Sequence, residues 1–152
     1  MAAALNEELL KGNTCFGCGP DNPDGLRIRI FRDPANASRL VGTYRPRAMQ
    51  AGFPQIVHGG LQFTALDCMA AWVVLILRQP GGMMPITKSA ATRYLAPACV
   101  GTELALSAEA STRRSSSSAS SSPGLGSGVA SAAVSNTYWD IMPVGTPSGS
   151  SP

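Results

Sequence analysis

The chain has 152 residues, enough for one domain with its own core; 44% of them are hydrophobic and only 14% are charged. So few charges are unusual on the surface of a monomer and favour an oligomer. The net charge of +3 is small and scattered, which argues against a nucleic-acid-binding protein.

Cysteine content and hydropathy suggest a compartment. Four cysteines without an obvious disulfide framework fit a reducing environment, and residues 1–8 lack the basic and apolar regions of a signal peptide. The longest apolar run, Ala65 to Leu77, contains Asp67 and is too short to span a bilayer. We therefore expect a cytoplasmic protein with no membrane partner.

The first third of the chain predicts an arm, a series of turns and two strands. Residues 1–14 are typical of a short helix or a loosely held arm, and three leucines could dock it, namely Leu5, Leu9 and Leu10. Residues 15–25 are dense in Gly, Pro, Asn and Asp, which favour consecutive turns. Apolar and basic residues alternate in Leu26–Phe31, which predicts a half-buried strand paired with Arg39–Tyr44.

The middle of the chain predicts one long helix, from about Gly60 to Arg78. It is apolar on nearly every side, which is typical of a helix inside a core. The sequence Gln79-Pro80-Gly81-Gly82 would end it. Three or four strands are expected beyond it: three at Ile86–Leu95, Glu103–Ser111 and Val129–Ile141, and a fourth if the Ser-rich segment between the last two forms an edge strand.

The order of these elements predicts an α+β domain in which one antiparallel sheet curls round one helix. The domain would span residues 15–143 and be followed by a disordered tail, residues 144–152. The Ser-rich segment 112–128 has little apolar surface, so we expect an ill-ordered sheet edge there rather than a regular strand.

The start of the helix concentrates the residues that could do chemistry. Asp67 is the only charged residue between positions 48 and 77, and a carboxylate in an apolar helix is costly unless it is paired, solvated or used. The sequence His58-Gly59-Gly60 leaves backbone N–H groups exposed at the helix N-terminus, where a developing oxyanion is favoured. An oxyanion site and an isolated carboxylate together suggest acyl chemistry.

Three separated segments resemble those of the hotdog-fold acyl-CoA thioesterases, in particular the phenylacetyl-CoA and 4-hydroxybenzoyl-CoA thioesterase-like group. The segments are Cys15–Gly19 with the turns after it, Gly52–Gly60 with Asp67, and Thr87 leading into Thr92–Gly101. The resemblance covers roughly residues 15–141. It implies a hotdog fold and hydrolysis of an acyl thioester to a free acid and a thiol, without a metal or other cofactor.

The resemblance also implies roles for individual residues. Asp67 would be the catalytic carboxylate, Gly59 N–H would polarise the thioester carbonyl, and Thr87 would assist from the strand after the helix. His58 would line the site as a positioning residue. Candidates for substrate contact are Gly60, Phe63 and Met69, although Met69 in such a helix is more typical of core packing. Where several members have Asn or Gln, this chain has Gly52, so that polar contact is missing or replaced.

The spacing of the two catalytic candidates predicts an oligomer. Asp67 follows Gly59 by eight positions, which is about 12 Å along one helix, so both cannot reach one carbonyl from one chain. Two antiparallel core helices related by a two-fold axis would bring them together. We therefore expect a homodimer, or a homotetramer of two dimers, whose chains share the acyl-CoA sites.

Other interpretations stay open from the sequence. Asp67 could be a structural carboxylate bonded to a hydroxyl such as that of Thr64, and the protein could bind acyl-CoA without hydrolysing it. A hotdog hydratase or dehydratase and a thioesterase of acyl-carrier proteins are further alternatives. Cys15 and Cys18 have the spacing of half a zinc site, but no second pair follows, which favours a turn with packed thiols over a zinc or redox module.

Overall fold

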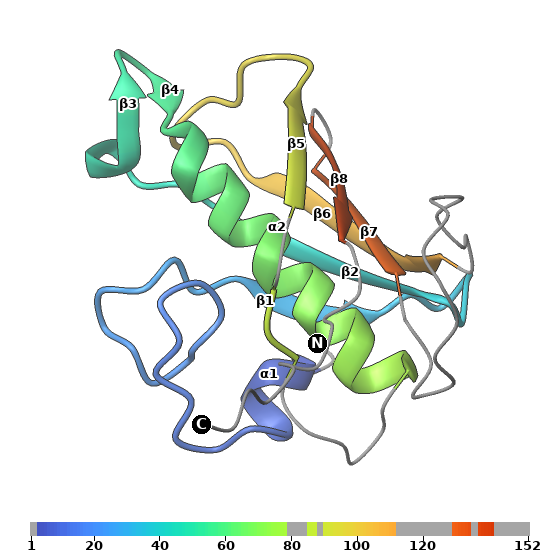
Figure 1. Ribbon diagram of the computed structural model, residues 1–152. Helices are drawn as coiled ribbons and strands as arrows, with labels where there is room; N and C mark the ends of the chain where they lie inside the picture. The colour runs from blue at the N-terminus through green and yellow to red at the C-terminus, as the bar shows by residue number, and fades with distance from the viewer. Residues whose placement is uncertain (1–2, 79–84, 88–89, 112–128, 135–136, 142–152) are drawn as a thin grey trace, which may run out of the picture.

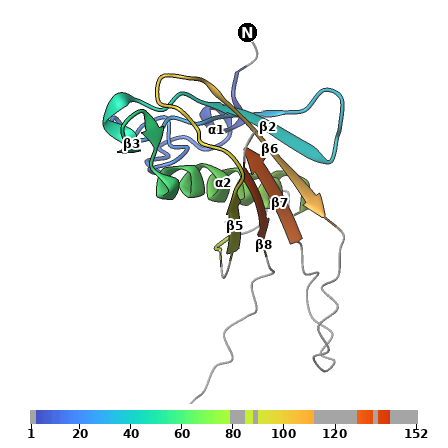
Figure 2. The ribbon, with the colours of Figure 1, turned by 90° about the horizontal axis from the view of Figure 1, so that it is seen from above.

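The computed structural model describes residues 3–78, 85–87, 90–111, 129–134 and 137–141. A six-stranded antiparallel sheet, in the order β1-β2-β6-β7-β8-β5, curls round the long helix α2 (Figures 1 and 2). Its strands are β1 (Arg29–Arg32), β2 (Arg39–Tyr44), β5 (Ala90–Tyr94), β6 (Leu104–Ser111), β7 (Val129–Val134) and β8 (Thr137–Ile141). The predicted α+β architecture is confirmed.

Helix α2 spans Gly59–Val73 and continues as a π-helical segment, Val74–Arg78, so the predicted helix is confirmed to within one residue. It packs against β2, β6 and β7, and its fully buried residues are Ala65, Leu66, Met69, Ala70 and Val73. By length and composition alone the helical segment Gly59–Leu77 could cross a membrane, contrary to the inference from the shorter apolar run. The sheet that covers it accounts for its apolar character, as in other core helices.

The first two strands agree with the apolar alternation in the sequence. Strand β2 has the predicted bounds, and Leu26, Ile28 and Ile30 are buried as the pattern requires. The ladder to β2 starts at Arg29 rather than at Leu26. The reason is local, because Arg27 has a φ of 57° and breaks the extended backbone before the strand begins.

The strands after the helix differ from the prediction in two places. Strand β5 begins at Ala90, whereas Ile86 and Thr87 lie outside any strand. The single strand predicted at Val129–Ile141 is wrong: it is the hairpin of β7 and β8, in which Val134 pairs with Thr137. Both the Ser-rich segment 112–128 and the predicted tail 144–152 lie outside the described residues.

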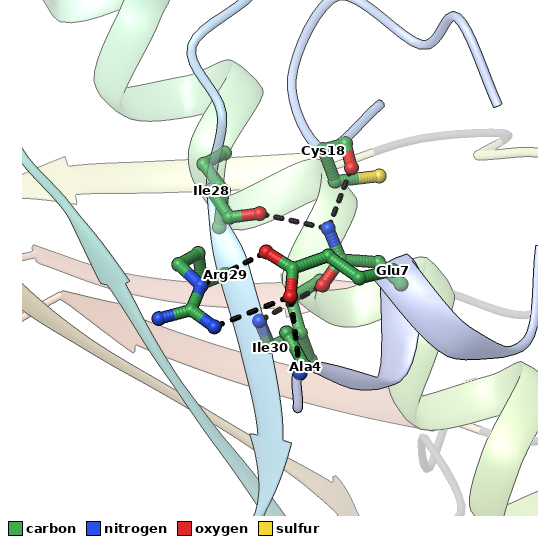
Figure 3. Close-up of polar contacts among 7 residues, drawn as sticks. Ala4, Glu7, Cys18, Ile28, Arg29 and Ile30 are labelled. Carbon is green, nitrogen blue, oxygen red and sulfur yellow. Dashed lines mark hydrogen bonds and ion pairs between the residues drawn. The ribbon is translucent and has the colours of Figure 1, made fainter. Parts of the chain in front are cut away.

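The N-terminal arm is docked by polar contacts. Helix α1 (Leu5–Glu8) places Asn6 in the core, where its Nδ2 donates to the carbonyl oxygens of Cys18 (2.6 Å) and Ile28 (2.9 Å) and its Oδ1 accepts from Ile30 N–H (3.1 Å) (Figure 3). Glu7 adds an ion pair with Arg29 on strand β1. Docking through Leu9 is wrong, because that side chain is 58% exposed.

A small hairpin, β3 (Ala51–Phe53) and β4 (Ile56–Val57), leads directly into α2. Its tip turns at Pro54 and Gln55, and Gln55 adopts a left-handed φ of 64°. Val57 N–H donates to the carbonyl of Ala98 at 2.8 Å, which ties the hairpin to the segment after β5. The hairpin therefore fixes where the helix begins.

Candidate active site

His58 is the N-cap of α2 and organises the backbone amides there. Its Nδ1 accepts the N–H of Gly60 at 3.0 Å, and its carbonyl accepts from Leu61 and Gln62. Gly59 N–H is thereby left over: within the described part of the chain it has no hydrogen-bond acceptor. A free N–H at the positive end of a helix dipole is suited to a carbonyl oxygen that gains negative charge.

Gly52 lies directly against His58. A Cβ at position 52 would lie 2.9 Å from His58 Cδ2 and 3.0 Å from its Cα, so any side chain there would collide with the histidine. His58 N–H also donates to the carbonyl of Gln50 at 3.0 Å. The imidazole occupies the space into which a polar residue at position 52 would project, which gives a physical reason for this departure from the family pattern.

Tyr94, which the sequence analysis did not single out, covers Gly59. Its hydroxyl donates to the Gly59 carbonyl at 2.9 Å, and a Cβ at position 59 would lie 3.3 Å from the ring. Both residues line an open depression of about 440 Å³, together with Ile56, Val57, Gln62, Leu95, Ala96 and Pro97. The depression is predominantly apolar, so it suits an acyl chain or ring better than a charged group.

Asp67 lies two helical turns further on, half-buried, and its partner is Thr87. The Thr87 hydroxyl donates to Asp67 Oδ1 at 2.5 Å, whereas the Thr64 hydroxyl donates to the carbonyl of Gly60. Bonding of Asp67 to Thr64 is therefore wrong. Within the described residues Thr87 is the one hydrogen-bond partner of this carboxylate, so the structure joins two of the predicted catalytic residues.

The remaining candidates are spread along the helix. Phe63 lies one turn before Asp67 and is half-buried, while Gly60 is exposed at the helix start. Met69 is fully buried, and its sulfur lies 2.9 Å from where a Cβ on Gly42 of β2 would be. Within one chain, then, Met69 packs in the core. Asp67 and Thr87 do not line the depression at Gly59.

Several large apolar side chains are exposed on the surface. They come from the 3₁₀ turn before β3, from β3 itself, and from residues around β5, and they are Met49, Phe53, Ile86, Tyr94 and Leu95. Strand β5 is an edge of the sheet and pairs only with β8 among the described strands. An unpaired edge beside exposed apolar side chains is typical of an interaction surface.

A group of three thiols lies where the N-terminal turns meet α2. Cys15 and Cys18, from the N-terminal turns, meet Cys68 of α2, with all three sulfurs within 4.8 Å of one another. Hydrogen bonds from the Cys68 thiol and from the backbone N–H groups of Cys18 and Gly17 lower the pKa of Cys15 to about 5. The same contact with Cys15 raises the pKa of Cys68.

No protein-family model and no curated protein sequence matches this chain. Its structure is similar to a thioesterase superfamily protein from Shewanella loihica (22% identity, 74% of this chain and 87% of that chain, TM-score 0.56). It is also similar to the Escherichia coli PaaI protein from the phenylacetic acid degradation operon (19% identity, 76% and 81%, TM-score 0.59).

A third similar structure is a phenylacetic acid degradation-related protein from Ralstonia eutropha (20% identity, 76% of this chain and 83% of that chain, TM-score 0.61). Likeness at such identities establishes the fold. The chain has a hotdog fold, as the resemblance in its sequence implied.

Proposed function

We propose that the protein is a thioesterase that hydrolyses an acyl-CoA to a free acid and coenzyme A. The observation that carries this proposal is the pair of features on one helix: an unused Gly59 N–H beside an apolar depression, and a half-buried Asp67 held by Thr87. The hotdog fold supports the same reaction class, and so does the resemblance of the sequence to the phenylacetyl-CoA and 4-hydroxybenzoyl-CoA thioesterase-like group. An arylacyl-CoA is therefore the first substrate to test.

In this reaction Gly59 N–H donates to the thioester oxygen as it becomes an oxyanion, a contact of a kind whose loss typically costs about 3 kcal/mol. Asp67 then acts in one of two ways. It takes a proton from a water that attacks the carbonyl carbon, or it attacks that carbon itself and forms an anhydride that water cleaves. Either way the C–S bond breaks and the sulfur leaves as the thiol of coenzyme A.

Thr87 and His58 support these two groups. The Thr87 hydroxyl fixes Asp67 Oδ1 and so orients the carboxylate. His58 Nδ1 accepts the hydrogen bond from Gly60 N–H, so Gly59 N–H is the donor left for a substrate. Neither residue needs to transfer a proton, so both are positioning residues.

The site is proposed to be shared between two chains. Gly59 and Asp67 are about 12 Å apart along α2, and Asp67 is absent from the depression at Gly59. A two-fold partner that adds its own β5 edge to this one would extend the sheet and cover the exposed apolar side chains next to it. Asp67 of one copy would then face Gly59 of the other. The assembly is a dimer or a pair of dimers, in the cytoplasm.

The test is release of free thiol from short, medium, long and arylacyl-CoAs by the wild type and by Asp67→Asn. We expect activity on at least one substrate and a loss of at least about 100-fold in kcat in the variant. The matched control is Asp21→Asn, the same change at an exposed carboxylate, which should keep full activity. Equal activity of Asp67→Asn and wild type would show that Asp67 is not the catalytic carboxylate.

A hotdog protein that binds acyl-CoA without hydrolysing it gives a different result in the same experiment. Acyl-CoA would then raise the Tm of the wild type and of Asp67→Asn, while neither releases thiol. A hydratase would change the absorbance of an enoyl-CoA without releasing thiol. Either outcome would overturn the proposed reaction while leaving the hotdog fold in place.

A further inference from the structure

Cys68 adds a third thiol to the Cys15-x-x-Cys18 pair. In the sequence this pair was only half of a zinc site, since no second pair follows it. In the fold, Cys68, which follows Cys18 by 50 positions in the sequence, brings a third sulfur to the pair, and all three sulfurs lie within 4.8 Å of one another. Cys18 and Cys68 are buried, whereas Cys15 is exposed.

We propose that Cys15, Cys18 and Cys68 bind a zinc ion. The sulfurs of Cys15 and Cys68 are 3.7 Å apart. Tetrahedral coordination with Zn–S bonds of about 2.3 Å requires sulfurs about 3.8 Å apart, so this pair already has the required separation. A disulfide would need the two sulfurs at about 2.05 Å.

The surroundings of the sulfurs suit thiolates. The indole N–H of Trp72 donates to Cys18 Sγ at 3.2 Å, and Asn13 Nδ2 lies 3.9 Å from the same atom. Donors of this kind hold the ligands of a metal in place and spread their negative charge.

The turn at residues 15–19 is built tightly against the helix. Gly19 N–H donates to the carbonyl of Cys15 at 2.9 Å, which closes the turn. A Cβ at position 17 would lie only 2.3 Å from Cys68 Sγ, and one at position 19 only 2.4 Å from Cys15 N. The two glycines therefore allow the turn to bring its sulfurs onto Cys68.

Zinc is the ion that fits this donor set. It prefers tetrahedral thiolate sites, and a ligand that is still a thiol releases its proton to solvent when its Zn–S bond forms. Three thiolates leave a fourth position, which a water would take. The ion would fasten the N-terminal turns to α2 one residue after Asp67.

The test is cobalt and zinc binding by the full chain under reducing conditions. Co²⁺ should give the thiolate charge-transfer band and strong visible bands of tetrahedral coordination, and Zn²⁺ should displace it. Cys15→Ser and Cys68→Ser should lose the charge-transfer band or most of its intensity. Cys99→Ser is the matched control, because Cys99 is outside the cluster, and it should retain the full spectrum.

The Tm measured with and without a chelator distinguishes zinc bound at the three cysteines from zinc bound loosely to the protein surface. A chelator should lower the Tm of the wild type by at least about 5 °C and leave that of Cys15→Ser unchanged. Cys15 is exposed, so this variant tests the idea even if Cys68→Ser fails to fold. The proposal is overturned if the wild type shows no charge-transfer band, if Cys99→Ser loses it equally, or if the chelator leaves the wild-type Tm unchanged.

Discussion

Replacing Asn6 by alanine tests how the N-terminal arm is held. The side chain is 2% exposed and makes three hydrogen bonds to backbone groups, at 2.6, 2.9 and 3.1 Å. Each such bond contributes about 1 kcal/mol, and a buried group left without a partner costs more. We expect Asn6→Ala to lower the free energy of unfolding by about 3–5 kcal/mol, a large part of the total for a domain of this size.

The assay is urea unfolding followed by circular dichroism, with the midpoint compared at a constant m-value. The control is Asn36→Ala, which removes two solvent-exposed hydrogen bonds of a half-buried asparagine and should cost no more than about 1 kcal/mol. Asn6→Asp should be as harmful as Asn6→Ala at neutral pH, because a carboxylate oxygen would face the carbonyls of Cys18 and Ile28. A loss below about 1 kcal/mol for Asn6→Ala would refute the reasoning.

Two further outcomes follow from single contacts. Thr87→Val should lower kcat about tenfold with little change in KM, because it removes the donor that orients Asp67. Thr87→Ser keeps a hydroxyl and should stay near wild type. Equal rates for both variants would contradict a role for the hydroxyl. The hydrogen bond from Arg29 lowers the pKa of the Glu7 carboxyl below its usual 4.5. The contribution of this ion pair to the free energy of unfolding is therefore fully present above that pH, and it is lost as the pH falls through the folded-state pKa. Glu7→Gln should therefore cost at most about 1 kcal/mol at pH 7 for this half-exposed pair. Its difference from wild type in urea unfolding should shrink as the pH falls and vanish once the pH is below the folded-state pKa of Glu7.

The hydrophobic pattern of the sequence predicted the strand and the helix whose apolar residues pack in the core. Strand β2 and the whole of α2 follow their hydrophobic patterns, because burial on one face or on all faces leaves a trace in the sequence. The hairpin of β7 and β8 leaves a weaker trace. Its strands are joined by only two residues, Ser135 and Asn136, so the apolar run looks continuous when it is read as one strand.

Contacts between distant segments were beyond sequence reasoning. The family resemblance pointed to Asp67 and Thr87, but nothing in their spacing of 20 positions shows that they touch. Tyr94 over Gly59 and Cys68 beside Cys15 depend in the same way on how the sheet and the turns fold against α2. Asn6 would be taken for a surface residue in any composition-based analysis, because asparagine is mostly exposed in proteins.

The most direct test of a shared site is to mix two inactive variants. Asp67→Asn lacks the carboxylate. Gly59→Val carries a side chain where even a Cβ would lie 3.3 Å from the Tyr94 ring, so it should displace the ring or the helix start that presents the N–H. After unfolding and refolding together in equal amounts, half of the dimers are mixed and each contains one intact site. The account predicts thiol release at about a quarter of the wild-type rate. No activity in the mixture, with mixed dimers present, would contradict it.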